Sequence, residues 1–225
     1  MSYNIFLSGG GSSTETYELD DMFLKTSGDR ILYLPIGLKR SIAEYDDCVT
    51  WFTDMVNSHS ILKNISAWIN VSSKTSKIDR KRFDGIYIGG ASETFSLHNL
   101  FIKHDMYPKL LSFVQQGGLI YGGSGGASIL GRSINYDQIE KSQPRVEENS
   151  ANLCMGYSVF AHLNNTNLSI IETLSNGSVI GIPEGGGCMI DNQKKVITYV
   201  GTSKALILTN FSSRYLKNKE STNII

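Results

Sequence analysis

Over the first 130 residues, short apolar runs alternate with amphipathic helical patterns, and several of the runs end in glycine. Parallel strands must be joined by long crossover connections, which are usually helices, and their sheet is covered on both faces. The alternation therefore predicts an α/β fold, with a mainly parallel central sheet and helices on both of its faces. The expected strands cover residues 4–11, 30–37, 65–73, 83–91 and 117–123, and the expected helices cover 12–25, 41–59, 93–103 and 106–116.

The second part of the chain has a different pattern. Residues 135–150 are polar and predict a loop near the rim of the sheet. Beyond them, short apolar runs predict strands joined by turns, with a hairpin turn at Asn176-Gly177. No repeat or long linker divides the chain, so we expect a single domain over residues 1–211. A polar C-terminal tail over residues 212–225 is expected to fray.

The composition excludes several classes of protein. The chain carries 21 basic and 21 acidic side chains, so no net field would attract nucleic acid or an anionic membrane. It has no run of eighteen apolar residues and no signal-peptide pattern at its start. Its three cysteines, at 48, 154 and 188, have neither disulfide-framework nor zinc-ligand spacing. We therefore expect a cytoplasmic protein that acts on a small molecule or peptide.

The stretch YGGSGGAS, residues 121–128, places four glycines around Ser124 directly after an apolar run. This pattern is typical of a nucleophile elbow, a tight strand-to-helix turn that exposes a serine hydroxyl above a sheet. The serine backbone is strained in such a turn, and the residues two before and two after it must be small. Gly122 and Gly126 meet this demand, and residues 126–134 can begin the helix. Ser124 is therefore the candidate nucleophile.

A serine hydroxyl is a poor nucleophile at neutral pH and needs a base, which in turn needs an orienting carboxylate. Of the four histidines, His59 and His98 fall within helical patterns and His104 at a helix end, where structural histidines are common. His162 follows a strand-like run downstream of the elbow, and it is the candidate base.

Two carboxylates are candidates for the third group. Glu184 follows the apolar run SVIGIP, just beyond the carboxyl end of a predicted strand, where open α/β sheets gather their functional residues. Asp137 lies in the polar loop after the elbow, where an acidic residue is usually only solvated. We rank Glu184 first and keep Asp137 as the alternative.

Catalysis by a serine also needs backbone N–H groups aimed at the developing oxyanion. Gly125, the residue after the candidate nucleophile, can supply the first donor. The run YIGGA, residues 87–91, can supply the second from Gly90 or its neighbour Gly89. These glycines also suit tight strand-to-helix packing, and the two interpretations are compatible.

The order Ser124, His162, Glu184, with IYIGG upstream and IGIPEGG downstream, resembles the dipeptidase E and cyanophycinase family of serine peptidases. The resemblance extends from IFLSGGG to about VITYVG. It implies a fold similar to the class I glutamine amidotransferases, which is a flavodoxin-like three-layer sandwich. It also implies Ser124 as nucleophile, His162 as base and Glu184 as orienting carboxylate, with Gly90 and Gly125 at the oxyanion positions. No metal or organic cofactor is required, and a homodimer would follow the family's habit.

The sequence departs from the family pattern in two loops. The family usually has alanine after the serine, where this chain has Gly125, and its GGG-N-T turn is replaced here by GGASET. Members of the family prefer an N-terminal aspartate, which needs a cation nearby. No lysine or arginine lies between Arg145 and Lys194. The candidates are therefore Arg132, Lys141 and Arg145.

Two other functions compete with a serine peptidase. In an esterase of the α/β-hydrolase type the acid precedes the histidine, which would require Asp137. The second is a catalytically silent or regulatory module on the same scaffold, with its GGGSS and GGASE loops binding an anion. Neither loop matches the dinucleotide-binding or P-loop pattern.

Overall fold

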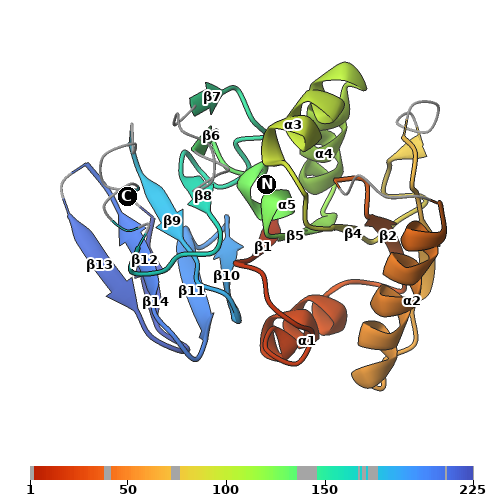
Figure 1. Cartoon of the computed structure of the whole chain (residues 1–225), viewed down its shortest axis with the longest axis horizontal. Coiled ribbons are helices and arrows are strands. Elements are labelled where there is room, and N and C mark those ends of the chain that lie inside the picture. Colours follow the sequence, from red (N-terminus) through yellow and green to blue (C-terminus); the bar gives the residue numbers. More distant parts are fainter. Residues whose placement is uncertain are drawn as a thin grey trace.

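The structure, a computed structural model, describes residues 3–37, 42–71, 77–135, 146–166, 168, 171, 177–210 and 212–224. In this part of the chain an eight-stranded mixed sheet has the order β14-β11-β10-β1-β5-β4-β2-β3 (Figure 1). Its strands are β1 (Asn4–Ser8), β2 (Arg30–Leu34), β3 (Asn64–Ala67), β4 (Gly85–Ile88), β5 (Leu119–Gly123), β10 (Gly186–Asp191), β11 (Val196–Gly201) and β14 (Ser221–Asn223).

Helices cover both faces of the half of this sheet formed by β1, β5, β4, β2 and β3, which pair in parallel (Figure 1). One core cluster packs side chains of two helices against one face, and a second cluster packs those of the other helices against the opposite face. The first pair is α1 (Tyr17–Thr26) and α2 (Ile42–Ser58), and the others are α3 (Thr94–Lys103), α4 (Met106–Gln115) and α5 (Gly125–Ser128).

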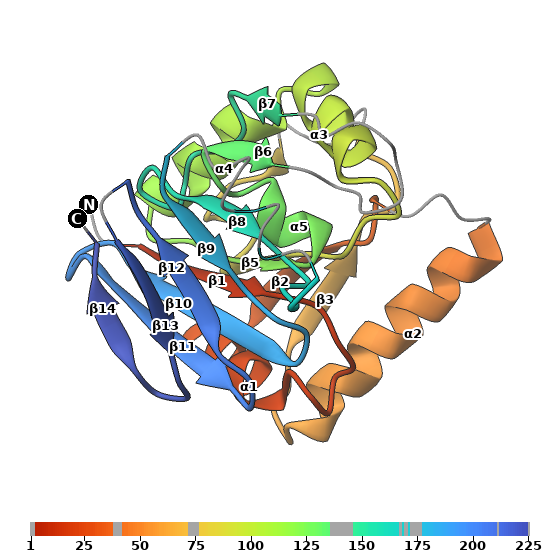
Figure 2. The same ribbon diagram turned by 60° about the vertical axis from the view of Figure 1, so that its left-hand side comes forward.

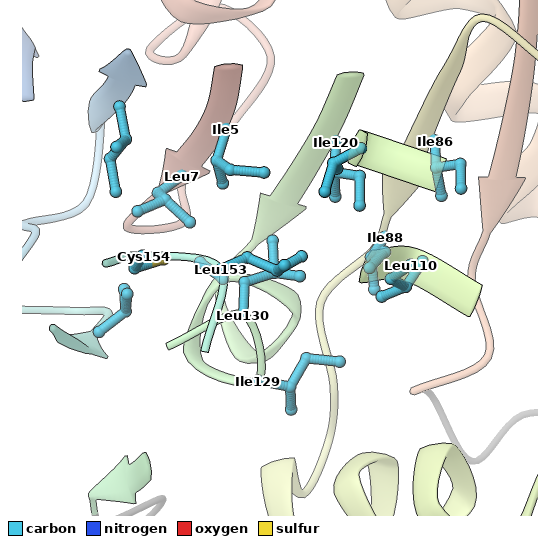
Figure 3. Packing of buried hydrophobic residues seen from close by; sticks show 14 of the residues in the cluster. Ile5, Leu7, Ile86, Ile88, Leu110, Ile120, Ile129, Leu130, Leu153 and Cys154 are labelled. Atoms are coloured by element: carbon cyan, nitrogen blue, oxygen red, sulfur yellow. The ribbon is translucent and has the colours of Figure 1, made fainter. Parts of the chain in front are cut away.

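Burial on both faces explains why β1, β2, β4 and β5 are largely continuous apolar runs, whereas the edge strand β3 alternates exposed and half-buried residues. Successive side chains of a strand point to opposite faces, so Ile86 and Ile88 of β4 enter one cluster while Tyr87 enters the other. Figure 3 shows side chains of β1, β4 and β5 meeting Leu110 of α4 and Leu130 beyond α5.

The other half of the large sheet is antiparallel and is covered differently. β1 pairs antiparallel with β10, β10 with β11, and β11 with β14. A four-stranded sheet of order β13-β12-β9-β8 shares the core on this side (Figure 2). Its strands are β8 (Ser158–Phe160), β9 (Val179–Gly181), β12 (Ala205–Leu208) and β13 (Ser213–Leu216).

The α/β class predicted from the sequence is confirmed, whereas the mainly parallel, flavodoxin-like sheet is not. Four of the seven strand pairings of the large sheet are parallel and three are antiparallel. A second sheet takes the place of helices over part of one face because the chain after residue 150 forms short strands.

Two local expectations are also wrong. The segment after Ser212 does not fray: β13 pairs with β12, and β14 pairs with β11. The helix after Ser124 is only four residues long. The chain then forms β6 (Ser133–Asn135), which pairs antiparallel with β7 (Val146–Glu148). β7 lies within residues 135–150, which were predicted to be a loop. Asn176 of the predicted hairpin turn lies outside the described residues.

Cys48, Cys154 and Cys188 are all free and buried. Burial raises the pKa of the Cys154 and Cys188 thiols well above its usual range, so both stay protonated at neutral pH. Within the described ranges, no helix combines the length and the apolar character that crossing a bilayer requires.

Candidate active site

Ser124 lies at the turn between β5 and α5, with φ 52° and ψ −118°, a backbone conformation that non-glycine residues rarely adopt. Its flanking glycines make this turn possible. A methyl group at Gly122 would lie 2.5 Å from the carbonyl oxygen of Gly126, and one at Gly126 would lie 2.6 Å from the carbonyl oxygens of Gly89 and Ile88. The strand, turn and small flanking residues have the geometry that the elbow pattern predicts.

The candidate base and carboxylate come from the smaller sheet. β8 and β9 pair in parallel, with Phe160 opposite Gly181. His162 follows the carboxyl end of β8 and Glu184 follows that of β9, so the two side chains emerge at the same edge. Sequence reasoning placed each residue after a strand, but the adjacency of those strands is a tertiary feature.

The three side chains form a chain of hydrogen bonds. The Oγ of Ser124 lies 2.6 Å from Nε2 of His162, and Nδ1 of His162 lies 2.8 Å from Oε1 of Glu184. With the imidazole proton on Nδ1, that N–H donates to the carboxylate and leaves Nε2 to accept from the serine hydroxyl. The His162 side chain is 46% exposed and that of Glu184 is 65% exposed. The arrangement therefore opens to solvent on the carboxylate side.

Three consecutive carbonyl groups at the end of β1 hold these elements together. The carbonyl of Ser8 accepts from the Ser124 N–H at 3.0 Å, and that of Gly9 accepts from the His162 N–H at 3.1 Å. The carbonyl of Gly10 accepts from the N–H of Gly185, the residue after Glu184, at 2.9 Å. The end of β1 thus fixes the backbone at all three side chains. Sequence reasoning missed this role, although the run SGGG after the first strand was its visible signal.

Gly10 also touches the imidazole directly. It has φ +101°, and a methyl group there would lie 2.5 Å from Cε1 of His162. Glycine is therefore required at this position for both its backbone conformation and its size.

The candidate oxyanion glycines differ in their availability. The Gly89 N–H donates to the carbonyl of Leu34 at 3.0 Å, so it is already used by the sheet. Gly90 lies against the serine, since a methyl group there would lie 3.6 Å from Cβ of Ser124. Gly125 is the first residue of α5, where an N–H has no acceptor within the helix. Gly90 and Gly125 are thus better placed than Gly89.

The two loops that depart from the family pattern pack against one another. A methyl group at Gly125 would lie 2.8 Å from Cβ of Ala91 and 2.9 Å from Oγ1 of Thr94. Ala91 stands where the family turn has its third glycine. A methyl group after Ser124 would therefore collide with the facing loop.

Arg132, the candidate cation that the structure describes, is not brought to this site. Arg132 lies at the amino end of β8 and β9, since its N–H donates to the Tyr157 carbonyl and its guanidinium lies against Gly177. His162 and Glu184 lie at the opposite end of the same strands. Asp137, Lys141 and Arg145 lie outside the described residues.

The other histidines have structural surroundings. His98 is buried in α3 with its Nδ1 2.8 Å from the hydroxyl of Tyr107. His59 is buried against Asp21 and stacks on Tyr17. His104 follows the last residue of α3. Among the described residues, no group of three His, Cys, Asp or Glu side chains is arranged to hold a metal ion.

Two further carboxylates lie close to the glycine loop. Hydrogen bonds from the backbone and hydroxyl of Ser12 lower the pKa of Glu15, whose side chain borders Gly185. Asp20 of α1 is almost fully buried, and burial raises the pKa of its carboxyl, to which Thr16 donates a hydrogen bond. Glu15 is therefore a charged neighbour of the loop, and Asp20 belongs to its buried support.

Two cavities flank the site. One, of about 410 Å³, borders Gly89 and Gly90 and is walled by Tyr33, Trp51 and Tyr87. The other, of about 490 Å³, lies beside the residues that follow His162 and precede Glu184. Both volumes suit a small ligand.

Ser124 lies on a strand-to-helix turn and is hydrogen-bonded to a histidine, which in turn is hydrogen-bonded to a carboxylate. This arrangement is typical of the serine hydrolases. The chain belongs to peptidase family S51, whose family model matches residues 5–198. This match confirms the resemblance to the dipeptidase E family.

Solved structures share the fold. The crystal structure of a peptidase from an acI-B1 Actinobacterium superimposes with a TM-score of 0.77 at 17% identity, covering 100% of this chain and 98% of that one. A "Putative Peptidase E Protein" from Listeria monocytogenes EGD-e gives a TM-score of 0.66 at 19% identity, covering 90% of this chain and 100% of that one. The search of curated proteins found no match.

Proposed function

We propose that this member of family S51 is a serine peptidase that hydrolyses small peptides through an acyl-enzyme, with Ser124, His162 and Glu184 as its catalytic triad. The observation that carries the proposal is the continuous chain of hydrogen bonds, 2.6 Å from Ser124 to His162 and 2.8 Å from His162 to Glu184. The order of the three residues in the sequence, Ser124, His162 and Glu184, is the one that the family resemblance implies.

In this mechanism the Oγ of Ser124 attacks the scissile carbonyl carbon while Nε2 of His162 takes its proton. The backbone N–H groups of Gly90 and Gly125 bind the oxyanion of the tetrahedral intermediate. Nε2 then returns the proton to the leaving amine, and the acyl-enzyme forms. Glu184 holds the imidazole in the required tautomer and stabilises it when protonated. A water molecule, activated by His162, completes the hydrolysis.

The finer expectation of N-terminal aspartyl substrates has less support. The described residues that line the cavity beside Gly90 include the carboxylate of Asp47 and no cation. Burying a substrate carboxylate without a compensating cation is costly. We therefore propose small peptides as the substrate class without a preference for aspartate.

Labelling by a fluorophosphonate probe tests the mechanism, because only an activated serine reacts. We expect the wild type to be labelled and Ser124→Ala not to be. His162→Ala and Glu184→Gln should label at least about a thousandfold more slowly, since triad members act as a unit. Asp137→Asn serves as the matched control for Glu184→Gln, and it should label at the wild-type rate.

Circular dichroism should confirm that each variant is folded. A folded wild type that resists the probe and cleaves none of a panel of dipeptides would favour the silent binding module. Slower labelling in Asp137→Asn than in Glu184→Gln would instead favour the esterase-like order of residues.

A further inference from the structure

The cavity of about 410 Å³ adjoins the nucleophile turn through two of its lining residues. Gly90 lies against the serine, since a methyl group there would lie 3.6 Å from Cβ and 3.9 Å from Oγ of Ser124. The hydroxyl oxygen of Tyr87 lies close to the residue before the serine, since a methyl group at Gly123 would lie 3.8 Å from it. The cavity therefore borders the turn that carries the reactive hydroxyl.

One face of α2 contributes the outer part of this cavity. Asp47 and Trp51 both line it, and they are one helical turn apart, so their side chains lie on the same face. Both side chains are exposed, whereas the other two large lining residues, Tyr33 and Tyr87, are almost fully buried. The cavity thus has an aromatic floor, with a carboxylate and an indole ring at its mouth.

The charge in this cavity is negative. Asp47 is the only carboxylate among its described lining residues, and none of them is a lysine or an arginine. In the part of the chain that the structure describes, no group forms a hydrogen bond or an ion pair with the Asp47 carboxylate. Burial raises the pKa of the Tyr87 hydroxyl well above its usual range, so the floor stays neutral there. The carboxylate is therefore available to a ligand.

A carboxylate beside an indole ring suits an organic cation. An ammonium or guanidinium group is attracted to the face of an aromatic ring within about 6 Å of its centre, and most strongly to tryptophan. A carboxylate adds a charge-assisted hydrogen bond to the same group. The aromatic floor can bury an apolar stem between the cation and the serine. An anionic ligand would instead be repelled by Asp47 and would find no cation in the described lining.

We infer that this cavity binds a cationic group of the substrate, with Asp47 as its ion-pair partner and Trp51 as the ring that packs against it. The inference rests on the proposed function, because it assigns the cavity to the molecule that Ser124 attacks. A basic side chain and a free α-amino group are two sources of the same cation chemistry, and the test separates them. Peptides that carry neither group near the scissile bond should bind weakly.

Calorimetric binding to the Ser124→Ala protein tests the cavity without requiring turnover. Acetyl-lysine amide carries its cation on the side chain, norleucine amide carries it at the α-amino group, and acetyl-norleucine amide is neutral. We expect one or both cations to bind at least about tenfold more tightly than the neutral amide. Adding Asp47→Asn should abolish this preference. Asp46→Asn, the matched control, removes the same charge from the adjacent residue, which is not among the described lining residues, and should leave the preference unchanged.

The contribution of the ring is tested separately. Adding Trp51→Leu should weaken cation binding at least about threefold, and adding Trp51→Phe should keep part of that affinity because an aromatic face remains. The chain has two tryptophans, and Trp68 is buried. A change in tryptophan fluorescence that accompanies cation binding and is lost in Trp51→Phe would therefore place the cation beside Trp51.

Fluorophosphonate labelling of the wild type tests whether the cation lies beside Ser124. The cation that binds more tightly should slow labelling at least about fivefold at a saturating concentration, because its stem occupies the space next to Gly90. Acetyl-norleucine amide at the same concentration should have little effect.

Each result has a distinct meaning. Equal binding of cationic and neutral amides, a preference that survives Asp47→Asn or is lost equally in Asp46→Asn, or no binding at all would each overturn the assignment. Binding of a cation that depends on Asp47 but leaves labelling unchanged would also overturn it, because the cavity would then lie outside the substrate site. If the wild type resists the probe without any cation present while binding depends on Asp47, the peptidase mechanism fails and the cation site remains. Labelling that depends on Ser124, without any preference for a cation, has the opposite meaning.

Discussion

At the scale of single residues, the glycine loop after β1 has two separate requirements. It must present three carbonyl groups in succession, and it must leave room for the imidazole. Gly10 combines a φ of +101° with the closest approach to His162. Gly117 also has a positive φ, of +83°, but a methyl group there would meet nothing within 4 Å. Comparing alanine substitutions at Gly10 and Gly117 therefore separates the effect of backbone strain from the effect of displacing the His162 imidazole.

Gly10→Ala should slow fluorophosphonate labelling at least about tenfold, because a methyl group 2.5 Å from Cε1 must move the imidazole away from Ser124. Gly117→Ala has a similar backbone strain of about 1 kcal/mol and should label normally. Measured melting temperatures should fall in both variants. Equal labelling rates in the two variants would show that the contact between Gly10 and His162 has no influence on reactivity.

At the scale of secondary-structure elements, the site depends on how the loop between β4 and α3 fits against the turn between β5 and α5. The methyl group of Ala91 fills the space that an alanine after Ser124 would occupy. Interiors are close-packed, so two such groups cannot share one space. An alanine at position 125 would therefore compete with Ala91 for the same space.

Gly125→Ala alone should lower the free energy of unfolding by about 1–3 kcal/mol through overpacking. Ala91→Gly in the same protein should recover part of this loss, while Thr94 Oγ1 still limits the recovery. Denaturant unfolding of the wild type, both single variants and the double variant gives the coupling energy. Additive effects, with no recovery, would mean that the two loops do not compensate.

At the scale of the whole molecule, residues 212–224 add a strand to each of the two sheets. β13 pairs with β12 in the smaller sheet, and β14 pairs with β11 at the edge of the larger one. Leu216, at the end of β13, is fully buried in the main core cluster. β13 also contributes Tyr215 to the cavity of about 490 Å³. The C-terminal segment thus belongs to the core and also lines one of the two cavities.

Leu216→Ala should lower the free energy of unfolding by about 3 kcal/mol, because it leaves a cavity in the core. Leu62→Ala, at a side chain that is 90% exposed, is the matched control and should change it by less than about 0.5 kcal/mol. Urea unfolding followed by circular dichroism measures both. A loss no greater in Leu216→Ala than in Leu62→Ala would restore the expectation of a frayed tail.

The sequence by itself determined the features that depend on neighbouring residues. The glycines around Ser124 predict the elbow because backbone strain and close approach act within a few residues. The apolar runs predict the parallel strands and the α/β class because a strand that is buried on both faces needs no alternation. His162 and Glu184 could each be placed after a strand, but not beside one another.

Only the tertiary structure decided which strands are neighbours. The parallel pairing of β8 and β9 joins His162 to Glu184, and the end of β1 joins both to Ser124. The antiparallel half of the large sheet and the pairing of the polar C-terminal strands were missed for the same reason. Strand pairing is decided by side-chain packing and backbone hydrogen bonds between distant segments, and a local sequence pattern does not specify the partner.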